Sequence, residues 1–464
     1  MVSIVIKTTE KQQEAIQAQS THVLVRGIPG SGKTIVLVEK VKDILENEPN
    51  AKVLFITFNH TLRAYLEAQL EDSGSTGKLE LTTYHTWAKR VLTNVLNGLG
   101  TNNFRKIDAI FKQHYTKYPS KSTYFVNKDY EKFVKEEWEW MKGKAIDSIE
   151  EYLDVTRVGR GVSLGPKSRQ ELYAFFEQVE GDILLKDLVP HVNYGKLVMH
   201  HADKVRQAFG YTHILVDEAQ DLTQAEMTSL SRVVGDMGQL VVAADLGQKI
   251  YKTEYTWKSA EINILGGRTK TLDIAHRSTK QIMDLATSLI QHDPLVKGDT
   301  QGRPQQVIRE GSKPNVLRTS NDKKCVVELV KELRKDGADF SIGVLTFTNR
   351  EADQIVNEIN SVSIDAKKVD KDSPKLERAK VSVMTMYGAK GLEFDIVVIP
   401  AVNERFPYLS NILEEDHEEQ INLMRRLLYV SMTRARNELY LIHTGHPSRY
   451  LIELDEKLYI SKFV

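Results

Sequence analysis

The segment VLVRGIPGSGKTIVLVEKV, residues 23–41, constrains the fold of this chain more than any other. It begins as a β-branched apolar run, passes through a glycine-rich turn and continues with the apolar periodicity of a helix. Gly27, Gly32, Lys33 and Thr34 fill the spacing of a P-loop, in which backbone N–H groups close around phosphates at a helix N-terminus. The strand before the turn and the helix after it favour a nucleotide-binding α/β domain over a chance glycine-rich turn.

The P-loop predicts how ATP and Mg²⁺ would be held. Lys33 is expected to reach the β- and γ-phosphates, and Thr34 is expected to bind Mg²⁺ through its hydroxyl. The expected phosphate cradle consists of Gly27, Gly30, Ser31, Gly32, Lys33 and Thr34.

A second motif, HILVDEAQD at residues 213–221, ends an apolar run in three carboxylates. Asp217, at the end of the predicted strand, supplies the oxygen ligand for Mg²⁺ that the P-loop lacks. Glu218 can then orient and deprotonate the attacking water. A solvated acidic turn is the alternative, but a chain that already contains a phosphate cradle favours the catalytic interpretation. Gln220 and Asp221 are not needed for hydrolysis alone.

The rest of the chain indicates two or more domains of a soluble α/β protein. With 464 residues, of which 41% are hydrophobic and 27% charged, it is too long for one ordinary core. Short β-branched runs alternate with helix-like segments, which predicts buried parallel sheets. The 63 basic and 63 acidic residues balance, so any surface for nucleic acid must be local.

Targeting signals and cysteine chemistry add few constraints. The single cysteine, Cys325, excludes an intrachain disulfide and a cysteine-based zinc site. The N-terminus lacks a basic start followed by a long apolar core, and no apolar run is long enough to span a membrane. We therefore expect no membrane association and a cytoplasmic location.

Further motifs follow in order and resemble those of the UvrD/Rep-like helicases of superfamily 1. The form DEAQD is typical of that family, as are TTEKQQEAI before the P-loop and FITFNHTLRAYL and LTTYHTWAKRVL after it. The series continues with VVAADLGQKIY, LDIAHRSTKQI, VMTMYGAKGLEFDIVVI and RRLLYVSMTRAR. One such motif would be a weak signal, but the ordered set covers nearly the whole chain. The forms YGAKGLEF and YVSMTRA resemble the UvrD/Rep branch, which moves 3′ to 5′.

The resemblance implies roles that spacing alone does not explain. Gln12 and Glu393 would contact the nucleotide, and Gln248 would sense the γ-phosphate. Arg277 and Arg434, from a second domain, would stabilise the negative charge of the transferred phosphoryl group. The implied catalytic residues are Lys33, Glu218, Gln248, Arg277 and Arg434.

The resemblance also implies a surface for single-stranded nucleic acid. Stacking of bases on aromatic rings contributes roughly 1–3 kcal/mol per base and tolerates any sequence. Which aromatic side chain stacks on a base after Gln248 is left open between Tyr255 and Trp257. The implied contacts are Thr57, Phe58, Asn59, Thr83, His85, Tyr251, Trp257 and Thr385.

The implied architecture is α/β, with two RecA-like P-loop NTPase domains built on parallel sheets and a mostly helical insertion. The expected domains are residues 1–91 with 206–270, an insertion at 92–205 in the first domain, and a second domain at 271–464. UvrD-like enzymes carry a large second accessory subdomain before AKGLEF. Here only about twenty residues separate Ser361 and Lys380, so we expect this subdomain to be absent.

The insertion contains two candidate surfaces for nucleic acid. Residues 103–135 hold eight lysines and arginines against three acidic residues, with tyrosines and phenylalanines interleaved. A solvated charged face is an equal alternative. A second basic stretch contains Arg157, Arg160, Lys167 and Arg169. Trp138 and Trp140 are expected to pack in a core or an interface.

Together, these features predict an ATP-driven translocase or helicase on single-stranded DNA, moving 3′ to 5′, in DNA repair, recombination or anti-phage defence. The sequence does not distinguish DNA from RNA. A second interpretation is a regulatory ATPase that gates a partner protein on a separate chain, such as a nuclease or RNA polymerase, with little unwinding of its own. Dependence of ATP hydrolysis on single-stranded DNA, or instead on a protein partner, would separate the two.

Overall fold

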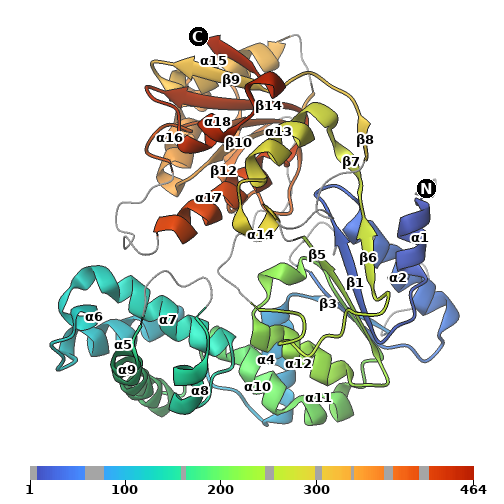
Figure 1. Cartoon of the computed structure of the whole chain (residues 1–464), viewed down its shortest axis with the longest axis vertical. Coiled ribbons are helices and arrows are strands. Elements are labelled where there is room, and N and C mark those ends of the chain that lie inside the picture. The colour runs from blue at the N-terminus through green and yellow to red at the C-terminus, as the bar shows by residue number, and fades with distance from the viewer. Residues whose placement is uncertain are drawn as a thin grey trace.

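The computed structural model describes residues 8–57, 78–157, 164–245, 255–297, 306–335, 339–369, 380–406 and 417–464. Within them the chain forms two large parallel sheets, each covered by helices, and a helical insertion (Figure 1). The expected α/β class with parallel sheets is therefore confirmed. None of the described helices is long and apolar enough to cross a membrane.

The first sheet has six parallel strands in the order β3-β2-β4-β5-β1-β6. They are β1 (His22–Gly27), β2 (Val53–Ile56), β3 (Leu79–Thr82), β4 (His213–Val216), β5 (Gln239–Ala244) and β6 (Thr269–Leu272). One face packs against α1 (Glu10–Ile16) and α2 (Lys33–Asn47), and the other against α4 (Tyr84–Val95), α10 (Tyr194–His200), α11 (Ala202–Phe209) and α12 (Gln224–Val234). Because both faces are covered, β2, β4 and β5 are buried along their whole length.

The strand order brings the P-loop and the DEAQD segment to the same edge of the first sheet. β5 lies between β1, which leads into the P-loop, and β4, which leads into residues 217–221. Since all three strands are parallel, their carboxyl ends meet at one edge. Ligands of open α/β sheets bind in the crevice outside these ends.

The insertion has a hydrophobic core of its own. It consists of α5 (Phe104–Lys117), α6 (Thr123–Val126), α7 (Glu131–Gly143), α8 (Ile149–Asp154) and α9 (Pro166–Leu185). Phe111 packs edge-on against Phe175, with 5.4 Å between ring centroids. Trp138 and Trp140 are buried in this core, as expected. Because α4, α10 and α11 pack on the first sheet instead, we propose that the insertion is narrower than 92–205.

The second sheet has seven parallel strands in the order β11-β12-β10-β13-β14-β9-β15. They are β9 (Asn315–Thr319), β10 (Ile342–Thr346), β11 (Ala366–Lys368), β12 (Val381–Thr385), β13 (Phe394–Ile399), β14 (Ala435–Thr444) and β15 (Ile460–Phe463). One face packs against α13 (Lys280–Ile290), α14 (Pro294–Lys297), α17 (His417–Met432) and α18 (Arg449–Glu453), and the other against α15 (Asp322–Leu333) and α16 (Asn349–Ser361). A separate parallel pair is formed by β7 (Ile274–Thr279) and β8 (Gln306–Arg309).

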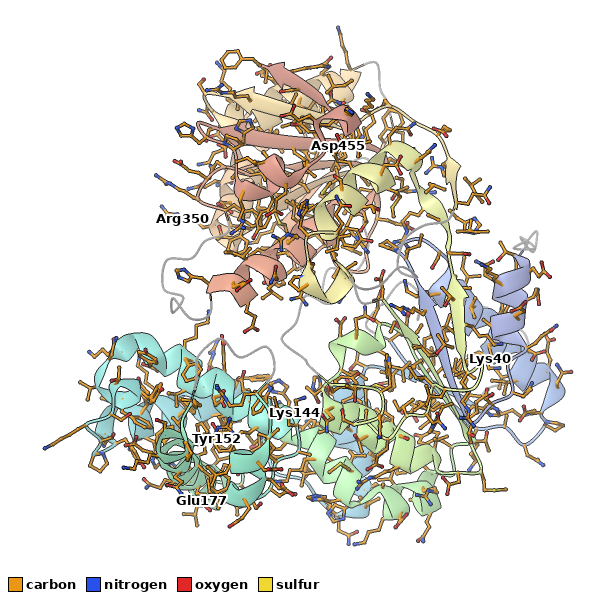
Figure 2. The ribbon with its side chains drawn as sticks, in the orientation of Figure 1. Lys40, Lys144, Tyr152, Glu177, Arg350 and Asp455 are labelled. Atoms are coloured by element: carbon orange, nitrogen blue, oxygen red, sulfur yellow. The ribbon has the colours of Figure 1, made fainter. Side chains whose placement is uncertain are left out.

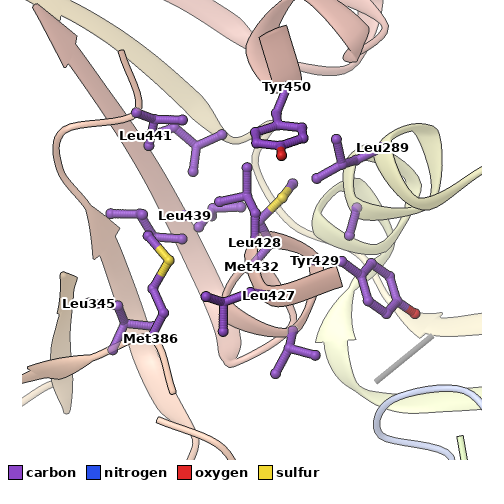
Figure 3. Packing of buried hydrophobic residues seen from close by; sticks show 14 of the residues in the cluster. Leu289, Leu345, Met386, Leu427, Leu428, Tyr429, Met432, Leu439, Leu441 and Tyr450 are labelled. Carbon is purple, nitrogen blue, oxygen red and sulfur yellow. The ribbon is translucent and has the colours of Figure 1, made fainter. Parts of the chain in front are cut away.

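Helix α17 is anchored by leucines in the core of the second domain (Figure 3). Leu427 and Leu428 are fully buried and belong to one cluster with Leu289 of α13 and Leu439 of β14. This packing fixes the end of α17. Arg434 follows two residues later, so its position is set by the same core.

The segment between α16 and β12 is too short for an accessory domain. β11 follows α16 and pairs in parallel with β12, with Ala366 opposite Val381. The segment 369–380 therefore begins and ends on neighbouring strands of one sheet. Domains need roughly 50 residues or more, which this segment does not provide.

The chain passes once from the first sheet to the second domain, at Asp273. β6 ends at Leu272 and β7 begins at Ile274. Asp273 is buried, and its Oδ2 lies 2.5 Å from Nζ of Lys11 on α1. The connection is thus one residue long and is held by the helix that also carries Gln12.

Candidate ATP and nucleic-acid site

Gly30 and Gly32 give the P-loop a backbone that other residues rarely adopt. Their φ angles are 72° and 86°, and Gly32 is the N-cap of α2. A Cβ on Gly30 would lie 2.5 Å from Cβ of Arg277, and a Cβ on Gly32 would lie 2.4 Å from Nε2 of Gln12. The two glycines therefore allow the phosphate-binding turn and also the close approach of two other candidate residues.

A capping box at the start of α1 orients Gln12. Thr9 Oγ1 accepts a hydrogen bond from the Gln12 N–H, and the Gln12 Oε1 accepts one from the Thr9 N–H at 2.8 Å. The Gln12 Nε2 then donates to the carbonyl oxygen of Ser31 at 3.0 Å. The amide of Gln12 thus lies directly on the P-loop.

Lys33 lies at the centre of the P-loop and is buried. Its Nζ donates to the carbonyl oxygens of Gly27 at 2.7 Å and Ile28 at 3.1 Å. The same Nζ lies 3.6 Å from Oδ2 of Asp245, at the end of β5. These contacts place the lysine charge at the carboxyl edge of the sheet, where the resemblance implies phosphates.

Thr34 and Asp217 bring two oxygen atoms together beside the P-loop. Thr34 Oγ1 donates to Asp217 Oδ2 at 2.9 Å. Burial and the negative charge of Glu218 raise the pKa of Asp217 to about 7. A divalent cation would favour the ionised form, and Mg²⁺ prefers oxygen ligands of this kind. Thr34 and Asp217 therefore fit the Mg²⁺ that the P-loop implies.

Glu218 is partly buried and has a left-handed backbone conformation, with φ 52°. Burial alone would raise the pKa of its carboxyl group, but the positive charges of Lys390, Lys33 and Arg434 hold this pKa below its ordinary value. The neighbouring positive charges therefore favour the deprotonated carboxylate, against the effect of burial. A deprotonated carboxylate beside the P-loop is what a general base for hydrolysis requires.

Gln220 connects Glu218 to the end of β5. Its Nε2 donates to Oε2 of Glu218, and its Oε1 accepts a hydrogen bond from the Asp245 N–H at 3.1 Å. Asp245 in turn lies beside Lys33. Gln220, which hydrolysis alone does not require, thus orients the candidate base relative to the P-loop lysine.

Two arginines of the second domain lie at this edge. Arg277, on β7, places Nε 2.6 Å from Oε2 of Glu393. The neighbouring His276 N–H donates to the Gly30 carbonyl oxygen at 3.0 Å, so β7 touches the P-loop. Arg434 is buried, and its Nε donates to a carbonyl oxygen of α17. Burial and the charge of Arg277 lower the pKa of Arg434 to about 10.

The sequence did not reveal the ion pair between Asp221 and Lys390. The Lys390 Nζ lies 2.5 Å from Oδ1 of Asp221, and the two side chains are only 10% and 7% exposed. Asp221 ends the DEAQD segment of the first domain, and Lys390 belongs to AKGLEF of the second. The third carboxylate of DEAQD is therefore a contact between domains. The only indication in the sequence was that ATP hydrolysis does not require Asp221.

The implied nucleic-acid residues of the first domain do not form one exposed patch. Thr57 is buried. Thr83 caps α4, where its Oγ1 accepts from the Thr86 N–H. His85 is 40% exposed, and its Nε2 lies 3.0 Å from Oε1 of Glu226 on α12. Of the three, the arrangement therefore favours His85 as an accessible contact.

The remaining implied contacts are less exposed or lie elsewhere. Trp257 is partly buried against the first-domain core and packs edge-on against Tyr255, whose hydroxyl donates to the Ala219 carbonyl oxygen at 3.1 Å. Thr385 Oγ1 accepts from the Gly388 N–H at 3.1 Å in the second domain. Four implied residues fall outside the described part of the chain, namely Phe58, Asn59, Gln248 and Tyr251.

In the second basic stretch of the insertion, Arg157 and Arg169 are structural, whereas Lys167 is exposed and Arg160 lies outside the described residues. Arg157 is 5% exposed, and its Nε lies 2.7 Å from Oε1 of the fully buried Glu137. Arg169 donates to three backbone carbonyl oxygens between residues 152 and 155. Both guanidinium groups hold the insertion together. Exposed basic side chains remain on α5, including Lys106 and Lys112.

Comparison with known proteins identifies both halves of the chain. Residues 8–273 match the UvrD/REP helicase N-terminal domain, and residues 271–378 and 370–446 match the UvrD-like helicase C-terminal domain. A possible DNA helicase C-terminal domain from Lactobacillus plantarum, a solved structure, is 23% identical with a TM-score of 0.30, covering 40% of this chain and 98% of that one. At that score, the structural likeness supports no argument.

The similar proteins are considerably longer. DNA helicase II of Salmonella typhimurium is 23% identical over 305 residues, which are 61% of this chain and 40% of that protein. ATP-dependent DNA helicase PcrA of Staphylococcus aureus is 24% identical over 295 residues, which are 60% of this chain and 38% of that protein. The aligned part thus spans about two fifths of these relatives. From the two domain matches, the chain belongs to the UvrD/Rep helicase family.

Proposed function

We propose that this chain is an ATP-driven translocase and helicase on single-stranded DNA, moving 3′ to 5′. The main support for the proposal is that positive side chains of both domains act on Glu218. Lys33 belongs to the first domain, and Lys390 and Arg434 belong to the second. A general base that depends on both domains is active only when the cleft between them is closed. The names of the relatives, DNA helicase II and ATP-dependent DNA helicase PcrA, support the same function.

The roles of the side chains follow from their positions. Lys33 would neutralise phosphate charge, and Glu218 would accept the proton of the attacking water. Arg277 and Arg434 would stabilise the charge that develops on the transferred phosphoryl group. Mg²⁺, held by Thr34 and Asp217, would neutralise charge on the phosphate oxygens.

Nucleotide-dependent closure would move the second domain relative to the first. A single strand that contacts both domains would then be stepped along by each cycle of closure and release. His85 of the first domain and Thr385 of the second are the described candidates for these contacts. Base stacking and backbone contacts of this kind favour no particular sequence. We further propose that this motor acts in DNA repair, recombination or anti-phage defence.

A regulatory ATPase is a second candidate, and the short segment 369–380 favours it. A motor without a second accessory domain has less surface with which to separate a duplex. Its ATPase cycle could instead gate a partner protein on a separate chain, such as a nuclease or RNA polymerase.

The deciding measurement is ATP hydrolysis with Mg²⁺, with and without saturating single-stranded oligo(dT) or oligo(U). Strong stimulation by oligo(dT) supports the translocase, and movement of a 3′-to-5′ motor is then measured by displacement of a protein block from one end of the strand. If neither oligonucleotide changes the rate of ATP hydrolysis, the proposal is refuted and the regulatory ATPase is favoured.

A further inference from the structure

Four elements meet at the first turn of α12, immediately after the DEAQD segment. Lys144, at the end of α7 of the insertion, reaches Gln224 Oε1 at 3.4 Å and lies between the insertion and the first domain (Figure 2). A Cβ on Gly195 of α10 would lie 2.8 Å from the Glu226 nitrogen, so α10 packs closely there. His85 approaches from α4. This turn therefore joins the insertion, the candidate nucleic-acid motif and the candidate catalytic segment.

Glu226 uses its two carboxylate oxygens for two different contacts. Oε2 accepts from the Thr223 N–H at 2.8 Å and completes a capping box, in which Thr223 Oγ1 accepts from the Glu226 N–H at 3.3 Å. Oε1 lies 3.0 Å from Nε2 of His85. The carboxylate is buried, whereas the imidazole is 40% exposed. One side chain thus connects an accessible histidine to the backbone at the start of α12.

The backbone between Glu226 and Glu218 is short and constrained. Glu218 has the positive φ of the left-handed region, a conformation that non-glycine residues rarely adopt. The next residues, Ala219–Asp221, form a 3-10 turn, and Thr223 caps α12 directly after it. A shift of the first turn of α12 therefore changes the backbone that orients the Glu218 carboxylate.

We propose that Glu226 is a positioning residue that transmits nucleic-acid binding at His85 to the general base Glu218. This inference rests on the proposed function, because it takes His85 as a contact for single-stranded nucleic acid. A phosphate of the strand competes with Glu226 for the imidazole, and the carboxylate and the first turn of α12 respond. Glu226 does not touch the reacting atoms and acts through the turn.

The substitution Glu226→Gln separates the two contacts of this side chain. A carboxylate has two acceptor oxygens, but an amide has one acceptor and one donor group. Glutamine is the other residue that completes a capping box, so its oxygen can keep the Thr223 contact. The atom that faces His85 then becomes a donor instead of an acceptor, which removes the contact with His85 and keeps the cap.

The second domain offers a matched control. Thr348 and Glu351 form the same capping box at the start of α16, with the Thr348 N–H donating to Glu351 Oε2 at 2.8 Å and the Glu351 N–H donating to Thr348 Oγ1 at 3.2 Å. Glu351→Gln makes the same chemical change at the same helix position, on a helix that does not follow the DEAQD segment. Any effect of the amide on helix capping alone appears in both variants.

The experiment compares wild type, Glu226→Gln and Glu351→Gln, each as the full chain with Mg²⁺. ATPase rates are measured with and without saturating oligo(dT), oligo(dT) affinity by fluorescence anisotropy, and Tm by thermal unfolding. We expect Glu226→Gln to retain its unstimulated rate and Tm and to bind oligo(dT) at least as tightly as wild type, because the competing carboxylate is gone, while the stimulation by oligo(dT) falls about fivefold or more, the lower range for coupled sites. Glu351→Gln should keep the wild-type stimulation.

The outcomes separate this inference from the proposed function. If wild type is stimulated and Glu226→Gln is stimulated equally, Glu226 is only a helix cap and the inference is wrong. It is also wrong if Glu226→Gln lowers Tm and reduces both rates in parallel, because that result indicates a structural role. If oligo(dT) does not stimulate wild type, the proposed function fails first and the inference fails with it.

Discussion

The buried ion pair between Asp221 and Lys390 provides a sharp test of the closed cleft. Lys390→Met or Asp221→Asn removes one charge with little change in size and leaves the other charge buried. Both side chains are at most one tenth exposed, and breaking such a pair costs about 3–5 kcal/mol. Since the pair joins the two domains, we expect its loss to destabilise the conformation in which the two domains are in contact. At about 1.4 kcal/mol per factor of ten, each single variant should lose about 10²-fold or more in kcat.

The double variant Lys390→Met/Asp221→Asn has no unpaired charge at this position. Because Lys390 also lowers the pKa of Glu218, we expect the double variant to recover only part of the lost rate, with a coupling energy of about 1.5 kcal/mol or more. The assay is oligo(dT)-stimulated ATPase of the four proteins. The exposed pair Lys368–Asp353, at 2.7 Å within the second domain, is the control and should show almost no coupling. If the effects of the two site variants add within about 0.5 kcal/mol, the pair does not hold the cleft and this reasoning is refuted.

Three further predictions concern hydrolysis and movement. Lys33→Ala should abolish ATP hydrolysis while leaving the fold intact. Glu218→Gln should bind ATP but lose turnover, and turnover like wild type in purified Glu218→Gln would remove the general-base assignment. Arg277→Ala and Arg434→Ala should each lower kcat by about 10³-fold or more, while nucleotide affinity falls less. A normal rate in either variant would show that this arginine does not stabilise the transferred phosphoryl group. The isolated chain should open a 3′-tailed duplex poorly although it moves on single strands, because each base-pair step costs about 1.4 kcal/mol to unstack; efficient opening of long duplexes in a strand-displacement assay would contradict this.

Local patterns made the nucleotide site predictable from the sequence. The P-loop is a strand, a turn and a helix start within one short segment, and Gly30 and Gly32 have the positive φ angles that the motif requires. The DEAQD segment likewise follows a fully buried strand. The parallel order of the strands then brings Thr34 and Asp217 together, although 183 residues separate them. Here the fold class was sufficient to place two distant motifs at one edge.

Contacts between distant side chains could not be predicted in the same way. Asp221 and Lys390 are 169 residues apart, and neither neighbourhood indicates the other. Arg157 was predicted to belong to a nucleic-acid surface, because the sequence gives no sign of its buried partner Glu137 on α7. The bounds of the insertion could not be predicted from the sequence either. An amphipathic helix such as α10 has the same apolar stripe whichever core it packs against. Tertiary packing decides each of these cases.

The single residue between β6 and β7 has a mechanical consequence for the motor. Asp273 joins β6 of the first sheet directly to β7 of the separate β7–β8 pair, and Lys11 of α1 contacts it. If closure rotates the second domain about Asp273, displacement would grow with distance from this residue. The P-loop lies near Asp273, because β7 touches Gly30, whereas the insertion lies on the opposite side of the first domain (Figure 1). Under the proposed function, such a rotation would give a small displacement at the P-loop and a larger one beside the insertion.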